Sequence, residues 1–278
     1  MSITVAILHP GRMGVTIAGQ ARLAGARVVW CPAGRSQASA ERACAESLEP
    51  VPDMRELLSV SDIVLAVCPS AAAEAVASSV AAHGYAGLYV EANPVSPDKA
   101  QWIADLVSKQ GARVVDACIV GDIIRGVNSI RLYVAGIESD IAMVSEVFAG
   151  TKVDVLPLGS GIGKASALKI VLAHFMRASR VISAITYALA DSYGVSDELI
   201  VESTRLHSAL AEPNFLASVA ARAWRWASEA EEAADALKSV GLPDDFAVAT
   251  AKILRLWDHR KDNFQLNFTE ALESLRKG

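Results

Sequence analysis

Two glycines near the N-terminus, Gly11 and Gly14, lie where an apolar run meets a helical pattern in "AILHPGRMGVTIAG". A strand that turns sharply into a helix presents unpaired backbone N–H groups and the positive end of the helix dipole, which together bind phosphate. Gly11 would let the backbone approach a pyrophosphate, and Gly14 would let the helix pack closely on the strand. His9 takes the place of the first glycine of G-x-G-x-x-G. An ordinary strand-to-helix turn also fits, but the N-terminal βαβ setting favours a dinucleotide site.

Arg35 and Ser36 follow the next apolar run, in "ARVVWCPAGRS", and no acidic residue stands there. An acid at this position typically accepts hydrogen bonds from the ribose 2′-OH of NAD, whereas an arginine can pair with the 2′-phosphate of NADP. We therefore predict NADP in preference to NAD, with Arg35 and Ser36 as ligands of that phosphate. The alternative is a solvated arginine beside a serine that caps a helix.

Apolar β-rich runs in the first half of the chain alternate with alanine-rich helical patterns at 70–82 and 99–109. This alternation is typical of a parallel sheet with crossover helices. The predicted strands are "ITVAIL", "ARVVWC", "DIVLAVC", "GLYVEAN" and "RVVDACIV". Two further runs, "IRLYVAG" and "KVDVLPL", flank a predicted helix at 140–148 and would extend the sheet.

The pattern changes after Leu158, and residues 163–192 predict one helix about 45 Å long. Further helices follow, separated at "YGVSD", "AEPN" and "VGLPDD". The predicted fold class is α/β, with an N-terminal Rossmann dinucleotide-binding domain over 1–160. The long interdomain helix then leads into an all-α domain over 161–278 that binds substrate and dimerises. The predicted helix is apolar on nearly all sides, and about 115 C-terminal residues are too few to bury all of these sides. We therefore predict a homodimer through the helical domain.

Composition and charge exclude several classes of protein. The 278 residues carry a formal net charge of −5 without basic runs, which argues against a nucleic-acid partner. The apolar segment 170–190 is interrupted by His174, Arg177 and Arg180, so no membrane partner is expected. The four cysteines lack the spacing of a metal site or a disulfide framework, and the N-terminus lacks the basic segment of a signal peptide. We expect no metal and a cytoplasmic location.

Several motifs resemble those of the NADP-binding 6-phosphogluconate dehydrogenase and β-hydroxyacid dehydrogenase superfamily. "PGRMGVTIA" is similar to its glycine-rich turn, "VCPS" to the loop after the fourth strand, and "EANPVSP" to the loop after the fifth. "RAWRWASEAEEAADAL" followed by "GLP" resembles a branch with its own C-terminal domain, related to imine reductases. The resemblance implies cofactor contacts at Arg12, Met13, Cys68, Pro69 and Asn93, of which Asn93 would approach the nicotinamide ribose.

The resemblance also implies a catalytic residue, because "GIGKASALK" is similar to the start of the interdomain helix and places the family's lysine at Lys169. The implied activity transfers a hydride between NADP(H) and a small hydroxy or oxo substrate. Lys169 would be the general acid/base, with its pKa lowered by desolvation among Leu168, Ile170 and Leu172. A surface lysine that lays its stem on apolar neighbours is the alternative.

"VDACIVGD" sits where the family has its substrate-binding loop, which implies substrate contacts along 119–122 and one helical turn after Lys169. The implied residues are Ile119, Val120, Gly121, Asp122, Ala173 and His174. The sequence departs from the family at three of them. Ala173 replaces an asparagine, and Val120 and Asp122 replace a serine and a second glycine. These departures argue against a simple 3-hydroxy acid as the substrate.

Two other function classes remain open from the residues. An imine reductase would share this architecture, although such relatives generally lack the lysine kept at position 169. A non-catalytic NADP-binding regulator would keep the glycine turn and need no acid/base. His174 and Tyr187 are alternative proton donors. Arg222 and Arg225 share a helix face and could clamp an anion, or could equally be a solvated or interface pair near Glu229.

Overall fold

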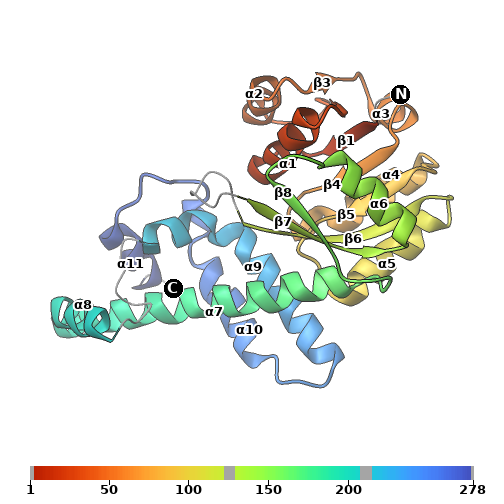
Figure 1. The fold of residues 1–278 in the computed structure, drawn as a ribbon. Helices are drawn as coiled ribbons and strands as arrows, with labels where there is room; N and C mark the ends of the chain where they lie inside the picture. The colour runs from red at the N-terminus through yellow and green to blue at the C-terminus, as the bar shows by residue number, and fades with distance from the viewer. Residues whose placement is uncertain (1–2, 122–128, 207–214, 277–278) are drawn as a thin grey trace. The chain divides into compact units, whose positions relative to one another are not determined.

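The computed structural model describes residues 3–121, 129–206 and 215–276 and divides into two compact units, 1–169 and 170–278 (Figure 1). The division falls inside the helix α7 (Lys164–Tyr193), whereas the predicted domain boundary precedes that helix at 160. The first residues of α7 belong with the first unit because hydrogen bonds attach Ala165 and Ser166 to its sheet.

The first unit is built on an eight-stranded sheet in the order β3-β2-β1-β4-β5-β6-β7-β8. The strands are β1 (Thr4–Leu8), β2 (Arg27–Trp30), β3 (Glu49–Pro50), β4 (Ile63–Ala66), β5 (Leu88–Glu91), β6 (Arg113–Val120), β7 (Ile130–Gly136) and β8 (Val153–Pro157). Strands β1 to β6 pair in parallel. Their carboxyl ends therefore meet at one edge of the sheet, where dinucleotides bind in such folds. The predicted fold class is confirmed.

Strand β7 departs from the expected parallel pattern, since it pairs antiparallel to β6 with Val120 opposite Arg131. Only nine residues, 121–129, connect the two strands. A parallel return needs a crossover of about a dozen residues or more, so a connection this short permits only a hairpin. Strand β8 is parallel to β7 again, because α6 (Glu138–Val147) provides a crossover between them.

Helices cover both faces of the sheet, and successive side chains of β1 point alternately into the two hydrophobic cores on these faces. Ile7 lies in the core beneath α1 (Arg12–Leu23), α2 (Gln37–Ala45) and α6. Leu8 lies in the opposite core, beneath α3 (Met54–Ser59), α4 (Ala73–Ala82) and α5 (Pro97–Ser108). A short 3-10 helix, η1 (Ser70–Ala72), precedes α4. Side chains of a strand alternate between faces, so a strand with both faces covered is apolar throughout.

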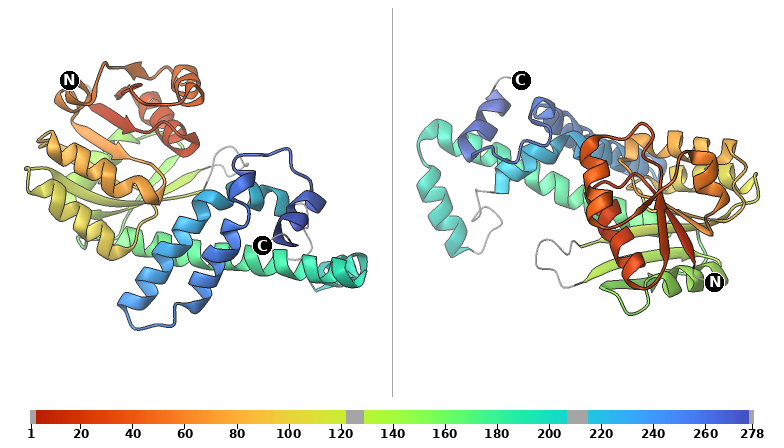
Figure 2. Two further views of the ribbon diagram at one scale, coloured as in Figure 1. Left: turned by 180° about the vertical axis from the view of Figure 1, so that it is seen from behind. Right: turned by 90° about the horizontal axis from the view of Figure 1, so that it is seen from above.

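The second unit is helical and contains the rest of α7 with α8 (Ser196–Arg205), α9 (Phe215–Ser239), α10 (Asp245–Arg255), η4 (Asp258–Arg260) and α11 (Phe268–Arg276). Helices α9 and α10 lie side by side (Figure 2). Trp257 is fully buried in this core and donates its indole N–H to the carbonyl of Ala271 at 2.9 Å. Across the described ranges, no helix combines the length and apolarity needed to cross a bilayer.

Candidate functional site

The turn between β1 and α1 leaves backbone N–H groups open at the carboxyl edge of the sheet. Gly11 is the N-cap of α1 and provides no side-chain cap, and a Cβ atom added to it would meet nothing within 4 Å. The first N–H groups of a helix have no partner within the helix. Open N–H groups beneath open space fit the phosphates of a dinucleotide.

Close packing of α1 on β1 depends on Gly14, because a Cβ there would lie 2.5 Å from the backbone oxygen of His9. His9 itself has φ +72°, in the left-handed region. A glycine would adopt this conformation freely, whereas it is uncommon for other residues. The chain therefore follows the backbone path of the three-glycine pattern and keeps a side chain at its first position.

The charge of Arg35 acts on the His9 ring. Burial, and after it the positive charge of Arg35, lowers the pKa of His9 to about 4, and a weaker interaction with the Leu8 backbone acts the other way. Arg35 also acts on Cys68, whose pKa burial raises to about 12 while Arg35 opposes the rise. The charge of Arg35, in the loop after β2, therefore acts on residues at the ends of β1 and β4.

Ser36 has the helix-capping role that was the alternative to phosphate binding. It is the N-cap of α2, and its Oγ accepts from the backbone N–H of Ser39 at 3.3 Å. Arg42 was not identified from the sequence, yet its Nε donates to the carbonyl of Pro10 at 3.2 Å and a second nitrogen donates to Ser39 Oγ at 3.0 Å. The i, i+3 spacing of 36, 39 and 42 was the available signal. These bonds attach α2 to the glycine turn.

Arg12 and Met13 are the first two residues of α1; Arg12 is exposed, and Met13 packs partly against the core beneath that helix. Both therefore stand at the turn.

Cys68 and Asn93 meet where β4 and β5 end. The Asn93 Oδ1 accepts from the Cys68 backbone N–H at 2.5 Å, and Pro69 follows directly. Asn93 is buried, and in the described part of the chain its Nδ2 has no partner. An unsatisfied buried amide N–H facing a strand-end edge fits a ribose hydroxyl as its acceptor.

Glu91 supports this corner and was missed in the sequence, although an acid at the end of an apolar strand was a signal. It is fully buried, accepts from the Asn93 backbone N–H at 3.0 Å and from the Tyr89 hydroxyl at 3.2 Å. Burial raises the pKa of Glu91 to about 7, against the effect of these bonds. Glu91 thus holds the backbone at Asn93 in place.

Asp116 on β6 caps α7 across fifty residues of sequence. Its carboxylate accepts from the Ala165 N–H at 2.9 Å, the Ser166 N–H at 3.2 Å and the Ser166 hydroxyl at 2.6 Å. Gly163 lies directly before the helix with φ +93° and has no side chain that could accept bonds from the first N–H groups of α7. Burial raises the pKa of Asp116, and the bonds from Ser166 and Ala165 oppose that rise. The start of α7 is therefore fixed to β6.

Lys169 lies three residues beyond Ser166 and is held at the carboxyl end of β6. Its Nζ donates to the Ile119 carbonyl at 2.9 Å, and its charge opposes the burial that raises the pKa of Cys118 to about 11. Val120 and Gly121 (φ +101°) follow Ile119, and Asp122 lies outside the described residues. The predicted lysine and the predicted loop thus meet within the first unit.

Ala173 and His174 lie on the part of α7 that belongs to the second unit. Ala173 is buried. The His174 ring packs edge-on to Phe246 at 6.5 Å, and its buried Nδ1 lacks a partner in the described ranges. Tyr187 is also buried, edge-on to Phe268 at 5.4 Å, as expected of a core residue.

The other polar candidates of the second unit have structural contacts. Glu229 pairs with Arg177 at 2.6 Å, and the Arg177 guanidinium lies 4.1 Å from the centre of the Trp226 ring. Arg222 donates to the backbone oxygen of Ser218 at 3.0 Å and lies over Phe264. The sequence had left both a ligand clamp and a structural pair open for Arg222 and Arg225, and these contacts favour the structural role for Arg222.

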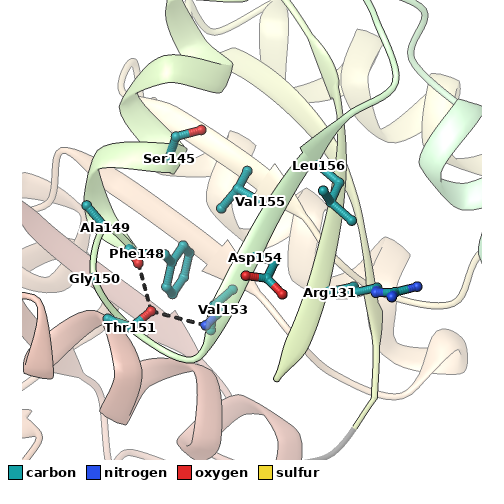
Figure 3. A pocket seen from close by; sticks show the side chains of 10 residues that line it. All are labelled: Arg131, Ser145, Phe148, Ala149, Gly150, Thr151, Val153, Asp154, Val155 and Leu156. Atoms are coloured by element: carbon teal, nitrogen blue, oxygen red, sulfur yellow. Dashed lines mark hydrogen bonds between the residues drawn. The ribbon is translucent and has the colours of Figure 1, made fainter. Parts of the chain in front are cut away.

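A shallow pocket of about 570 Å³ lies beside the last strand of the sheet, around β8 and the loop before it (Figure 3). Two hydrogen bonds hold the loop before β8. The Thr151 hydroxyl donates to the Phe148 carbonyl, and the Val153 N–H donates to that hydroxyl. None of its lining residues is a predicted site residue, and it presents Arg131 and Asp154 side by side. Among the residues that the structure places, no three His, Cys, Asp or Glu side chains gather as a metal site.

Comparisons with known proteins agree with this architecture. A curated protein from Methanothermus fervidus, described as an uncharacterized 28.5 kDa protein in the 7S RNA 5′ region, is 27% identical over 170 residues. That alignment covers 61% of this chain and 64% of the relative, which is less than two thirds of its length.

Two solved structures share the fold over nearly the whole chain. A 3-hydroxyisobutyrate dehydrogenase from Salmonella typhimurium is 17% identical with a TM-score of 0.75, over 98% of this chain and 99% of the other. A reductive aminase from Aspergillus terreus, in complex with NADPH and ethyl-5-oxohexanoate, is 19% identical with a TM-score of 0.62, over 92% and 93%.

Domain families account for both halves of the sequence and confirm the resemblance stated above. Residues 190–257 match a domain of unknown function, DUF1932. Residues 4–156 match the NAD binding domain of 6-phosphogluconate dehydrogenase and contain the glycine turn, Arg35, Asn93 and Asp116. Because this match covers more than half of its 278 residues, the chain belongs to the family defined by the NAD binding domain of 6-phosphogluconate dehydrogenase.

Proposed function

We propose that the protein is an NADP(H)-dependent oxidoreductase that moves a hydride between the nicotinamide and a small hydroxy or oxo substrate. The observation that carries the proposal is the position of Lys169, whose Nζ is held 2.9 Å from the Ile119 carbonyl at the carboxyl end of β6. Strands β1, β4 and β5 end at the same edge, so an ionisable amine and the NAD-binding turn share one unit.

The first N–H groups of α1, which follow Gly11, and the unsatisfied Nδ2 of Asn93 fit a nicotinamide dinucleotide. The proposed ligands are Gly11, Arg12, Met13, Gly14, Arg35, Ser36, Cys68, Pro69 and Asn93. When bound, the cofactor supplies or accepts the hydride at its nicotinamide ring. Asn93 would orient the ribose next to that ring, since its Oδ1 is already engaged by Cys68.

Lys169 would move the proton that accompanies the hydride. A neutral amine takes the hydroxyl proton when an alcohol is oxidised, and an ammonium returns it when a carbonyl is reduced. An ammonium has three N–H donors, and the Ile119 carbonyl engages one of them. The remaining donors can reach a substrate oxygen. Ile119, Val120, Gly121, Asp122, Ala173 and His174 remain the proposed substrate contacts.

The preference for NADP rests on charge. The charge of Arg35 acts on His9 and Cys68, at the ends of β1 and β4, and "CPAGRS" after β2 brings no carboxylate to repel a 2′-phosphate. Ser36 can cap α2 through one lone pair and still donate its hydroxyl hydrogen to the phosphate.

Imine reduction is the second candidate, because a reductive aminase solved with NADPH shares the fold. We rank it second because a lysine amine at the strand ends suits an oxygen that must gain or lose a proton. A regulator that binds NADP without turnover would not require this amine.

A homodimer through the helical unit is part of the proposal. Val171, Phe175, Ile182 and Leu189 are each more than half exposed and share one face of α7 at multiples of about one helical turn. Exposed apolar stripes of this length mark interaction surfaces, and a second copy of α7 would cover this one. Light scattering of the full chain at micromolar concentration should give twice the chain mass, and a monomer would contradict this.

The activity is tested on the purified full chain by following NADPH absorbance against small hydroxy acids, oxo acids and cyclic imines. We expect turnover with at least one C–OH or C=O compound and tighter binding of NADPH than of NADH. Turnover of imines alone would replace the first candidate with the second. Cofactor binding without turnover of any compound class would favour the regulator.

A further inference from the structure

His9 keeps an imidazole at a backbone position where a glycine is usual. Its φ of +72° is the conformation that the first glycine of the turn would adopt, and the residue lies between the end of β1 and the start of α1. Histidine adopts this region only occasionally. The imidazole is therefore kept at a conformational cost.

Two basic groups at this turn lack partners. The Nδ1 atom of His9 is buried without a hydrogen-bond partner in the described ranges. The Arg35 side chain forms neither an ion pair nor a hydrogen bond with any residue that the structure describes. Buried polar groups are nearly always hydrogen-bonded, so the unsatisfied Nδ1 of His9 indicates a missing partner, and the partly exposed Arg35 guanidinium, whose charge acts on that ring, is available to the same ligand.

Three arginines lie on segments next to His9, and the charge of Arg35 acts on its ring. Arg35 approaches from the loop after β2, Arg12 begins α1, and Arg42 on α2 donates to the carbonyl of Pro10, the next residue along the chain. Cys68, at the end of β4, is a neutral thiol because burial raises its pKa to about 12. An arginine whose charge acts on an imidazole suits an anion with several oxygens.

We propose that His9 binds the 2′-phosphate of NADP(H) together with Arg35, and that its imidazole takes up a proton from solvent as the phosphate binds. This inference deepens the proposed function and rests on it. In the proposed function, Arg35 and Ser36 determine the preference for NADP over NAD. This inference adds His9 as a further specificity residue and adds the uptake of a proton on binding.

The direction of proton movement follows from the cofactor-free site. Burial and Arg35 lower the pKa of His9 to about 4, so the ring is neutral near pH 7. A phosphate between the two side chains replaces repulsion by Arg35 with attraction and gives the ring nitrogen an acceptor, and both effects favour the imidazolium. NADH has a hydroxyl in place of the phosphate, so its binding should leave the ring neutral.

Calorimetric titration of the full chain with NADPH and with NADH tests the proposal directly. Titrations at pH 6.5 in PIPES and in Bis-Tris, which have different ionisation enthalpies, report the protons taken up. We expect uptake approaching one proton per site for NADPH and close to none for NADH. The affinity for NADPH should fall between pH 6 and pH 8, with the Kd rising by up to about tenfold per pH unit.

His9→Asn is the decisive variant, because asparagine tolerates the left-handed backbone and cannot hold the proton. The phosphate's own ionisation, near pH 6, persists in this variant, so the difference from the wild type isolates the imidazole. We expect the uptake to disappear, NADPH to bind about tenfold more weakly and NADH to stay within twofold. His83→Asn, at the exposed end of α4, is the matched control and should behave as wild type. If His9→Asn fails to fold by circular dichroism, His9→Gly replaces it.

Equal proton uptake by wild type and His9→Asn, or equal uptake with NADH and NADPH, would overturn this inference and leave the proposed function standing. Failure of the wild type to bind either nucleotide would overturn the proposed function and this inference together.

Discussion

Two regions of the same sheet edge differ in how completely their polar groups are satisfied. At the ends of β5 and β6, the buried carboxylates of Glu91 and Asp116 accept bonds from backbone N–H groups and hydroxyls. At the ends of β1 and β2, His9 and Arg35 have basic groups without partners among the described residues. The carboxylates of the first region find their partners within the chain, and we propose that an anion provides the partner of the second. Changes in the first should therefore affect the folded state, and changes in the second should affect ligand affinity.

The largest effect is expected from the amine that the first region positions. Lys169→Met keeps the apolar stem and deletes the proton carrier. The kcat should fall about 10²–10⁴-fold, the usual contribution of a general acid/base, and the pH–rate profile should lose one limb. NADPH affinity should be unchanged.

Lys164→Met is the control for this change, because Lys164 is exposed at the first position of α7 and its amine donates to the Leu158 carbonyl at 3.4 Å. Near-normal turnover of Lys169→Met with an unaltered pH profile would make Lys169 structural.

The next effect is on stability, through the cap of α7. Asp116→Asn removes the charge from a group that accepts from Ala165 and Ser166 and turns one oxygen into a donor. We expect a loss of about 1.5–3 kcal/mol in the free energy of unfolding, typical of hydrogen bonds to charged groups. Urea denaturation measures it, with the exposed Asp105→Asn as a matched control. An unfolding midpoint equal to that of the control would show that the cap contributes nothing.

The corresponding change in the unsatisfied region should leave stability intact. Arg35→Ala should weaken NADP binding by about 1.5–3 kcal/mol and leave NAD binding nearly unchanged, because only NADP has the 2′-phosphate. Fluorescence titration with both nucleotides measures this, and Arg55→Ala on the exposed side of α3 serves as the control. An equal loss of affinity for NADP and NAD would mean that Arg35 contacts a part of the dinucleotide that both cofactors contain.

The smallest effects are opposite responses of the two regions to pH without cofactor. The pKa of His9 is lowered in the folded state, so its contribution to stability is present above about pH 6.5 and is lost as the pH falls towards 4. The pKa of Glu91 is raised to about 7, so its contribution is present below pH 4.5 and is lost as the pH rises through 7.

Thermal melts between pH 7.5 and pH 5 measure both contributions. On acidification, His9→Asn should gain stability relative to wild type, and Glu91→Gln should lose it. Parallel melting curves for all three proteins would contradict both assignments.

Local patterns in the sequence were enough to predict most elements of the chain. The strands β1, β2, β4, β5, β6, β7 and β8 and the helix α7 lie within a few residues of the ranges predicted for them. Their signals are short-range, since apolar periodicity and turn residues act over a few positions. The glycine turn belongs to the same class, because its chemistry depends on backbone geometry that Gly11 and Gly14 specify locally.

Tertiary structure decided which of these elements act together. The antiparallel direction of β7, the attachment of Arg42 to Pro10 and the role of Glu91 were not predicted. Asp116 meets Ser166, and Ile119 meets Lys169, across fifty residues of chain. Such contacts depend on strand order and on the register of a helix against a strand, and no spacing along one segment encodes them. The residue types at the site could thus be read from the sequence, whereas the bonds that hold them exist only once the sheet has formed.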